Sequence, residues 1–219
     1  MNGVFVTGTG TEVGKTVVAA SIARKLANEG KRVAVFKPAI TGLDDYPTAD
    51  GTISHDIGGF SAHRPDHLVL RDAAGSSQAD EEVAPYRYGA PMSPHLAASL
   101  AGEEISRERL LAAARAAADG ADALVCEGVG GLLVPLAPDY LVRDFAVDLG
   151  LPLVVAASPG LGTINHTLLT LEAARSAGLE LARVVLTPWP DEPSPIERSN
   201  RETIAALGEV AVETLARLR

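Results

Sequence analysis

The sequence predicts a doubly wound α/β fold, with helices on both faces of a mostly parallel sheet. Three observations support this prediction. Apolar runs of strand length alternate with helical patterns, the runs are apolar at nearly every position, and a glycine-rich stretch follows the first run. Such continuous runs suit strands that are buried on both faces of a parallel sheet. Doubly wound folds bind ligands at the carboxyl ends of their strands, so the residues after each strand are the most informative.

The predicted elements follow in order along the chain. Strands are expected at 3–7, 32–36, 123–126, 153–157 and 184–186. Helices are expected at 16–28, 107–119, 142–149 and 165–177, with shorter ones at 56–62 and 94–100. Gly30 and Gly178 suit the ends of the first and last long helices, and Ser106 can cap the helix at 107–119.

Length and composition favour one domain spanning residues 1–219, because 47% of the residues are hydrophobic and can form one core. Residues 43–94, rich in Asp, Pro, Gly and Ser, are interpreted as a long excursion from the sheet. The net charge of -9 argues against nucleic acid or an anionic membrane as partner, because both need a basic surface.

The expected location is the cytoplasm. The single cysteine, Cys126, excludes a disulfide within the chain and suits a reducing compartment. The N-terminal residues show no basic region followed by a long apolar stretch, and no apolar run approaches the length of a membrane span.

Residues 8–16, GTGTEVGKT, resemble a loop that wraps the phosphates of a nucleotide. The usual pattern is G-x-x-x-x-G-K-[ST], whereas here Thr9 replaces the opening glycine and Gly8 makes the loop one residue longer. The N–H groups of such a loop converge on an anion, and the next helix adds its positive dipole end. We expect Lys15 to meet the terminal phosphates and the Thr16 hydroxyl to bind Mg²⁺. The fold is therefore expected to be of the P-loop NTPase type.

A second lysine, Lys37, lies directly after the predicted strand at 32–36. Beside a phosphate loop, a fixed cation could stabilise a developing anion or a transferring phosphoryl group. Thr41 could add a hydroxyl to the same site.

Carboxylates also follow the predicted strands. Glu127 ends a buried run, and a buried charge is costly unless it is paired or binds a metal. Asp56 is the preferred further candidate for Mg²⁺ binding, with Asp44, Asp45 and Asp50 as rivals.

The strand at 153–157 is followed by a glycine-rich turn and a helix that begins at Gly162-Thr163-Ile164-Asn165. Free N–H groups at a helix start can bind a carboxylate or a phosphate, and the alternative is an ordinary capped helix. Trp189 could flank a nucleotide base or anchor a loop. The histidines show no spacing of metal ligands.

Together these segments resemble dethiobiotin synthetase, the ATP-dependent enzyme that closes the ureido ring in biotin biosynthesis. The resemblance rests on VTGTGTEVGKT, FKPAITG, PMSPH, VCEGVGGLLVPL and GLGTINHTLLTLEAA, in the family's order and spacing over nearly the whole chain. The stretch WPDEPSPIERSNR is similar to the family's actinobacterial branch, and LGEVAVETLARLR resembles its last strand.

This resemblance implies a ligase that forms C–N bonds. CO₂, supplied as bicarbonate, would add to one amine of 7,8-diaminononanoate to give a carbamate. ATP would phosphorylate the carbamate, and the second amine would then close the ring and release phosphate. This chemistry needs fixed cations, which agrees with the two lysines after predicted strands.

The resemblance also implies roles for individual residues. The catalytic residues would be Lys37, Lys15 and Thr11. The nucleotide would contact Glu12, Val13, Gly14, Lys15, Thr16, Val17, Asp56, Glu127, Gly128, Val129, Gly130, Thr187 and Pro188. The substrate would contact Lys37, Thr41, Gly162, Thr163, Ile164 and Asn165. Mg²⁺ would bind Thr16, Asp56 and Glu127.

The family is a homodimer with its active site at the subunit interface. The resemblance therefore implies that the helix start at 162–165 binds the distal carboxylate of the substrate from the partner subunit. Many relatives have Asn-Asp where this chain has Thr187-Pro188, so the family's recognition of the base does not carry over to these two positions.

Two alternatives are a cobyrinic-acid amidoligase-like enzyme and a partition-type ATPase switch. The first would normally need a glutamine-hydrolysing site, for which the chain offers no Cys-His pair. The second usually carries an additional lysine at the start of its phosphate loop, where this chain has Gly8, Thr9 and Gly10.

Overall fold

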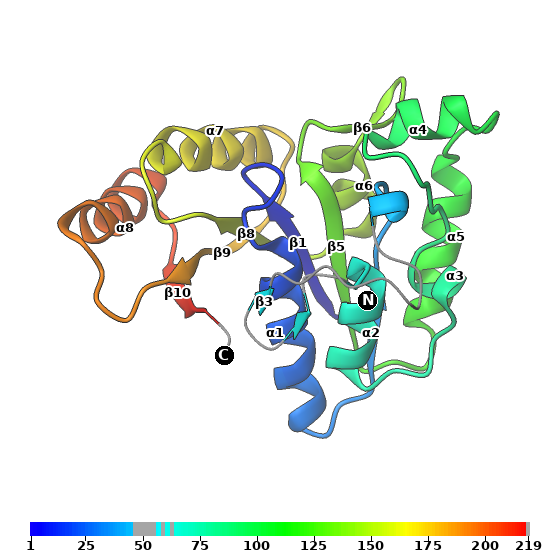
Figure 1. Cartoon of the computed structure of the whole chain (residues 1–219), viewed down its shortest axis with the longest axis horizontal. Helices are drawn as coiled ribbons and strands as arrows, with labels where there is room; N and C mark the ends of the chain where they lie inside the picture. The colour runs from blue at the N-terminus through cyan, green and yellow to red at the C-terminus, as the bar shows by residue number, and fades with distance from the viewer. Residues whose placement is uncertain (46–55, 58–59, 62–63, 218–219) are drawn as a thin grey trace.

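The computed structural model describes residues 1–45, 56–57, 60–61 and 64–217, with backbone only for 45, 56–57 and 60–61. Six parallel strands form one sheet in the order β10-β9-β8-β1-β5-β2 (Figure 1). These strands are β1 (Gly3–Gly8), β2 (Val33–Phe36), β5 (Ala123–Gly131), β8 (Leu153–Ala157), β9 (Leu181–Trp189) and β10 (Val212–Ala216). Two antiparallel pairs lie outside this sheet: β3 (Asp56–Ile57) with β4 (Phe60–Ser61), and β6 (Pro135–Ala137) with β7 (Tyr140–Leu141).

Strand β1 has β5 on one side and β8 on the other. The chain builds one half of the sheet with β2 and β5, and the other half with β8, β9 and β10. The direction of winding therefore reverses at β1, and the loop after β1 opens at the switch point where such sheets bind ligands.

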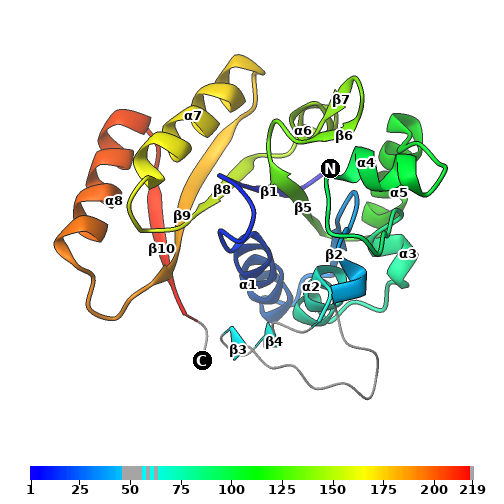
Figure 2. The same cartoon turned by 45° about the horizontal axis from the view of Figure 1, so that its top comes forward.

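Helices cover both faces of the sheet (Figure 2). They are α1 (Lys15–Asn28), α2 (Asp66–Ala74), α3 (Asp80–Val83), α4 (Pro94–Leu100), α5 (Arg107–Ala118), α6 (Val142–Leu149), α7 (Thr163–Ser176) and α8 (Pro195–Gly208), with a 3₁₀ turn η1 (Leu43–Asp45). One buried cluster joins Val6 and Val125 of the sheet to Val18 of α1 and Leu70 of α2. The opposite cluster joins the sheet to α5, α6, α7 and α8. The two clusters confirm the predicted doubly wound fold.

Several predicted elements have the predicted bounds, including the helices at 94–100 and 142–149 and the strand at 153–157. The helix predicted at 56–62 is wrong where the structure describes it, because Asp56–Ile57 and Phe60–Ser61 form the antiparallel pair β3–β4. The residues between these strands are Gly58 and Gly59 in sequence, and glycine is a poor helix former. Helices α2, α3 and α8 were not predicted. None of the helices in the described part of the chain is long and apolar enough to span a bilayer.

The outer edge of β2 is closed by a side chain. The amide oxygen Oε1 of Gln78 accepts a hydrogen bond of 2.9 Å from the Val35 N–H, and Nε2 donates one of 3.1 Å to the Val35 carbonyl. The Gln78 amide thus makes both bonds that a neighbouring strand would make at this residue.

Candidate functional site: the phosphate loop and its charged partners

The loop between β1 and α1 depends on two glycines. A Cβ atom on Gly8 would lie 2.6 Å from Cγ2 of Val13 and 2.8 Å from Cγ of Lys15. Gly14 is the N-cap of α1 and has φ 87° and ψ 23°, a left-handed conformation that favours glycine. A Cβ atom on Gly14 would lie 2.5 Å from Cγ2 of Thr187. The loop therefore packs tightly on its own lysine and on the end of β9.

Lys15 is buried at the first position of α1. Its Nζ atom donates a hydrogen bond of 2.7 Å to the Gly10 carbonyl, across the loop. Burial lowers the pKa of Lys15, and the nearby Lys37 lowers it further. Thr11 and Glu12 lie exposed in the loop, and Glu12 has a positive φ of 60°.

Lys37, directly after β2, is the most enclosed cation of the site and is only 3% exposed. Its Nζ atom lies 2.8 Å from Oε1 of Glu127 and 2.8 Å from Oδ2 of Asp66. Its backbone N–H donates to the Val83 carbonyl at 2.8 Å, which fixes the chain at this point. Burial alone would lower the pKa of Lys37, but the two carboxylates outweigh it and raise the pKa, so Lys37 is an ammonium ion.

Glu127 lies in β5, beside Val6 of β1, and is fully buried. Its Oε1 atom accepts hydrogen bonds from the Thr16 hydroxyl at 2.9 Å and from Lys37 at 2.8 Å. Its Oε2 atom is buried and has no hydrogen-bond partner among the described residues. Burial raises the pKa of Glu127, and Lys37 acts in the opposite direction. One oxygen of this carboxylate thus remains available to a further ligand.

Asp66, the first residue of α2, is a site residue that the sequence reasoning missed. Its side chain is 34% exposed, more than that of Lys37 or Glu127. Burial raises the pKa of Asp66, but the ammonium of Lys37 outweighs it, so the net pKa is lowered. A signal existed in PDHLVLRDAAG, where a proline precedes a short helical pattern that ends at glycine.

Asp56, the predicted metal ligand, lies in β3, and its side chain is outside the described residues. Its rivals Asp44 and Asp45 lie in η1, and Asp50 is outside the described residues. The assignment of Asp56 therefore stays a prediction, whereas Asp66 has a described place beside Thr16 and Lys37.

The oxygen atoms of Thr16, Asp66 and Glu127 fit a Mg²⁺ ion, which prefers hard oxygen ligands and keeps several waters. The unpartnered Oε2 atom of Glu127 supports this fit. Within the described ranges, no group of three or more His, Cys, Asp or Glu residues could hold a metal. Mg²⁺ takes few protein ligands and keeps several waters, which agrees with the three oxygen donors of Thr16, Asp66 and Glu127.

The other predicted residues lie on the same edge of the sheet or beyond it. Gly128 packs closely on Phe5 and Val142, and Gly130 has a positive φ of 59° at the end of β5. Val17, Thr41 and Val129 are half-buried. Thr187 is buried against the phosphate loop, and Pro188 is exposed.

Helix α7 begins after a tight turn that follows β8. Gly162 has φ 91° and ψ -15°, and the Thr163 N–H donates to the Gly160 carbonyl at 3.3 Å. These values match a type II turn, which needs glycine at its third position. Asn165 is exposed, and the Ile164 and Asn165 N–H groups have no partner among the described residues. The helix start therefore presents free N–H donors, and its role as an anion site stays a prediction.

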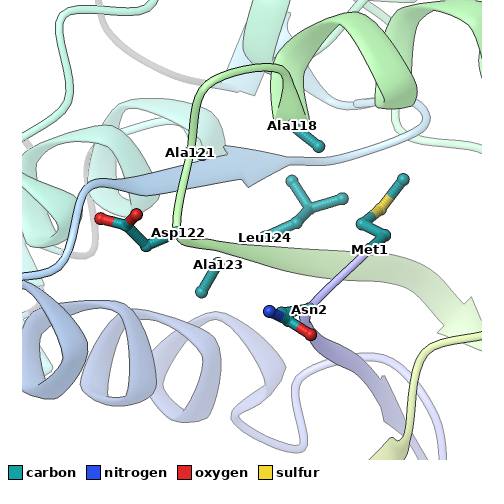
Figure 3. A pocket seen from close by; sticks show the side chains of 7 residues that line it. All are labelled: Met1, Asn2, Ala118, Ala121, Asp122, Ala123 and Leu124. Atoms are coloured by element: carbon teal, nitrogen blue, oxygen red, sulfur yellow. The ribbon is translucent and has the colours of Figure 1, made fainter.

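A separate pocket of about 230 Å³ lies between the start of β1, the end of α5 and the start of β5 (Figure 3). Its lining includes Met1, Asn2 and Asp122. It lies where β1 and β5 begin, whereas the phosphate loop follows the end of β1. We therefore assign it no part in the site.

Comparisons with known proteins concern the family and the fold of this chain. A family model described as an AAA domain matches residues 2–218. In fold, the chain is similar to the signal recognition particle 54 kDa protein of Aeropyrum pernix, with a TM-score of 0.51 and 12% identity over 98% of this chain and 42% of that one. This similarity concerns the fold alone, and it agrees with a P-loop NTPase architecture.

Three relatives share the description ATP-dependent dethiobiotin synthetase. The protein of Bacillus subtilis strain 168 is 36% identical over 97% of this chain and 85% of its own length. The protein of Anaeromyxobacter dehalogenans strain 2CP-1 is 42% identical over 94% of this chain and 86% of its own length. The protein of Rhodococcus erythropolis is 38% identical over 94% and 84%. With its phosphate loop, buried lysine and carboxylates in place, this chain belongs to the dethiobiotin synthetase family of ATP-dependent ligases.

Proposed function

We propose that the chain makes dethiobiotin, ADP and phosphate from 7,8-diaminononanoate, CO₂ and ATP, with Lys37 and Lys15 as its catalytic cations. The observation that carries this proposal is the buried Lys37 ammonium, held 2.8 Å from both Glu127 and Asp66 beside the phosphate loop. A cation that is fixed before the reaction stabilises developing negative charge without reorganisation.

The reaction has three steps. One amine of the substrate attacks CO₂ and loses a proton, which gives a carbamate. The carbamate oxygen attacks the γ-phosphorus of ATP, and ADP leaves. The second amine then attacks the carbonyl carbon of the mixed anhydride, loses a proton, and expels phosphate as the ring closes. No covalent enzyme intermediate is needed, so the protein acts by positioning and by charge.

The two lysines have different roles because they lie at different positions in the site. Lys15, at the start of α1, faces the phosphates that the loop encloses. Lys37, at the end of β2, neutralises the carbamate and the transferring phosphoryl group. Thr11, exposed in the loop, adds a hydroxyl near the reacting phosphate, and Thr41 contacts the substrate.

Mg²⁺ would be held by Thr16, Glu127 and Asp66, with Asp66 in the role predicted for Asp56. The ion would neutralise charge on the nucleotide phosphates when bound. The described contacts among the three side chains and the free Oε2 atom of Glu127 support this set.

The rest of the nucleotide would contact Glu12–Val17, Glu127–Gly130 and the end of β9 at Thr187 and Pro188. The close contact between Gly14 and Thr187 supports this placement, because it brings β9 next to the phosphate loop.

The substrate carboxylate would bind at the start of α7, from Gly162 to Asn165, in a homodimer whose subunits share each site. Exposed apolar side chains at α7 support an interface there: Leu161, in the turn before the helix, is 95% exposed, and Leu169 within it is also exposed. Mixing Lys37→Gln chains with Asn165→Asp chains tests this proposal. Mixed dimers with one intact site should regain activity if the sites are shared, and no regain would argue against sharing.

The remaining assignments are proposals as well. The membership of all six parallel strands in one sheet supports a single domain. The buried lone cysteine and the use of ATP support a cytoplasmic location. The WPDEPSPIERSNR stretch supports assignment to the actinobacterial branch of the family. The overall identities do not decide the branch, because they are 38% to the Rhodococcus protein and 42% to the Anaeromyxobacter protein.

A coupled assay tests the proposed reaction. ADP release should require both 7,8-diaminononanoate and bicarbonate, and dethiobiotin should form in a one-to-one ratio with ADP. ATP hydrolysis that is indifferent to the diamine would overturn the proposal.

A further inference from the structure

Asn200 is a buried polar residue of α8 whose side chain leaves its own helix. It is 6% exposed, and its Nδ2 atom donates to the Pro159 carbonyl at 2.8 Å and to the Gly160 carbonyl at 3.0 Å. Both carbonyls belong to the turn between β8 and α7, about forty positions earlier in the chain. The two amide hydrogens of Asn200 therefore tie α8 to this turn.

Asn200 is hydrogen-bonded to the turn that directly precedes α7, and this turn fixes the first residues of the helix. The Gly160 carbonyl also accepts the Thr163 N–H at 3.3 Å, which closes the type II turn over Leu161 and Gly162. The Gly160 carbonyl oxygen thus accepts one hydrogen bond from Asn200 and one from Thr163, the first residue of α7. Leu161, at the tip of the turn, is 95% exposed, so its side chain does not anchor the turn to this chain.

We propose that Asn200 is a positioning residue that holds the start of α7 ready for the substrate carboxylate. This inference rests on the proposed function of that helix start. Asn200 touches neither substrate nor nucleotide; it fixes the turn, and the turn aims the N–H groups of Ile164 and Asn165. Donors that are fixed in advance bind an anion without a further ordering cost.

The first experiment compares steady-state constants of the full-length wild type and Asn200→Ala. The KM for 7,8-diaminononanoate should rise roughly tenfold, because two buried carbonyls lose their donor and the turn loosens. The KM for ATP and kcat should each change by less than about twofold. Asn28→Ala is the matched control, since Asn28 is exposed at the end of α1, and it should leave all three constants unchanged.

A substrate analogue separates positioning from general damage. 2,3-Diaminooctane is the substrate without its carboxylate. The wild type should have a higher KM for this analogue, and Asn200→Ala should add no further increase. Equal increases for substrate and analogue in Asn200→Ala would overturn the positioning role while leaving the carboxylate site intact. A wild type that does not distinguish the two compounds would overturn the carboxylate site itself, and with it the role of Asn200.

A second variant keeps the inference testable if Asn200→Ala folds poorly. Asn200→Asp keeps the shape of the side chain but replaces the donor group with an acceptor facing two carbonyls. It should also raise the KM for 7,8-diaminononanoate, and hydrogen exchange at Thr163–Asn165 should become faster. A wild-type KM in a folded Asn200→Asp protein would refute the inference.

Discussion

The Nζ atom of Lys37 lies 2.8 Å from Oε1 of Glu127, and both side chains are almost completely buried. The pair joins the end of β2 to β5, and Asp66 adds the start of α2 as a third element. Removing one partner of a buried pair leaves the other as an unpaired charge, which costs about 3–5 kcal/mol. In the proposed mechanism, the site chemistry and the stability of the fold would therefore depend on the same contact.

Lys37→Gln should lower turnover by a factor on the order of 10²–10³, because the fixed cation is lost. ATP binding, measured by calorimetry, should remain close to that of the wild type, since the phosphate loop and Lys15 are intact. The control is Lys31→Gln, which removes an exposed lysine paired with Glu29. Unchanged turnover in Lys37→Gln would remove Lys37 from the mechanism.

Asp66→Asn should raise the Mg²⁺ concentration needed for half-maximal activity by roughly tenfold, because one charged oxygen ligand is lost. Asp56→Asn, made as the paired variant, should stay near the wild-type value. A titration of activity against free Mg²⁺ measures the half-maximal Mg²⁺ concentration of both variants. Chelation by EDTA should abolish the activity of the wild type and of both variants. The reverse order of effects would identify Asp56, and not Asp66, as the ligand.

Gly14→Ala should destabilise the nucleotide-free protein by about 1–3 kcal/mol, because alanine is strained at a positive φ. Its Cβ atom would also meet Thr187 at 2.5 Å. The control lies in the same loop: a Cβ atom on Gly10 would have nothing within 4 Å, so Gly10→Ala should change stability little. Urea unfolding of both variants measures the difference, and equal values would argue against the contact with Thr187.

Asp148 should make stability sensitive to acid. Partial burial raises its pKa, but hydrogen bonds from Arg107 at 2.7 and 2.8 Å and from Tyr140 at 2.6 Å outweigh it and lower the pKa below the ordinary 3.8. A carboxylate with a depressed folded-state pKa stabilises the fold above its unfolded pKa, and this contribution disappears as pH falls through the folded-state pKa.

Asp148→Asn should therefore cost about 1 kcal/mol near neutral pH, a modest value because Arg107 is largely exposed. The difference from the wild type should shrink as the pH falls below about 4. Urea unfolding across this range measures it, with the exposed Asp139→Asn as control. A difference that does not change with pH would contradict the assignment.

Much of the site could be predicted because its residues directly follow strands. The phosphate loop is one continuous segment, and Lys37 and Glu127 each end an apolar run, so sequence order already placed them at one edge of the sheet. The sheet could also be predicted, because each strand is a run of four to nine consecutive residues that are mostly apolar.

Asp66 and Asn200 could not be found in this way, because their roles depend on how helices pack. Asp66 reaches Lys37 because α2 packs against β2 and α1, and the region around Asp66 holds several other aspartates. Asn200 acts across the contact between α8 and the turn before α7, to which no local pattern points. Short helices within a polar segment also give a weak periodic signal, which is why α2 was missed.

The Gln78 amide at the outer edge of β2 limits how two copies of this chain can assemble. Another subunit could extend the sheet past β2 only by displacing both hydrogen bonds that Gln78 makes with Val35. Since Lys37 directly follows this strand, such an exchange would also disturb Lys37, the cation proposed for catalysis. Subunits can therefore pair through helices, loops or the β10 edge, so a dimer whose subunits share each site would form without extending the sheet past β2.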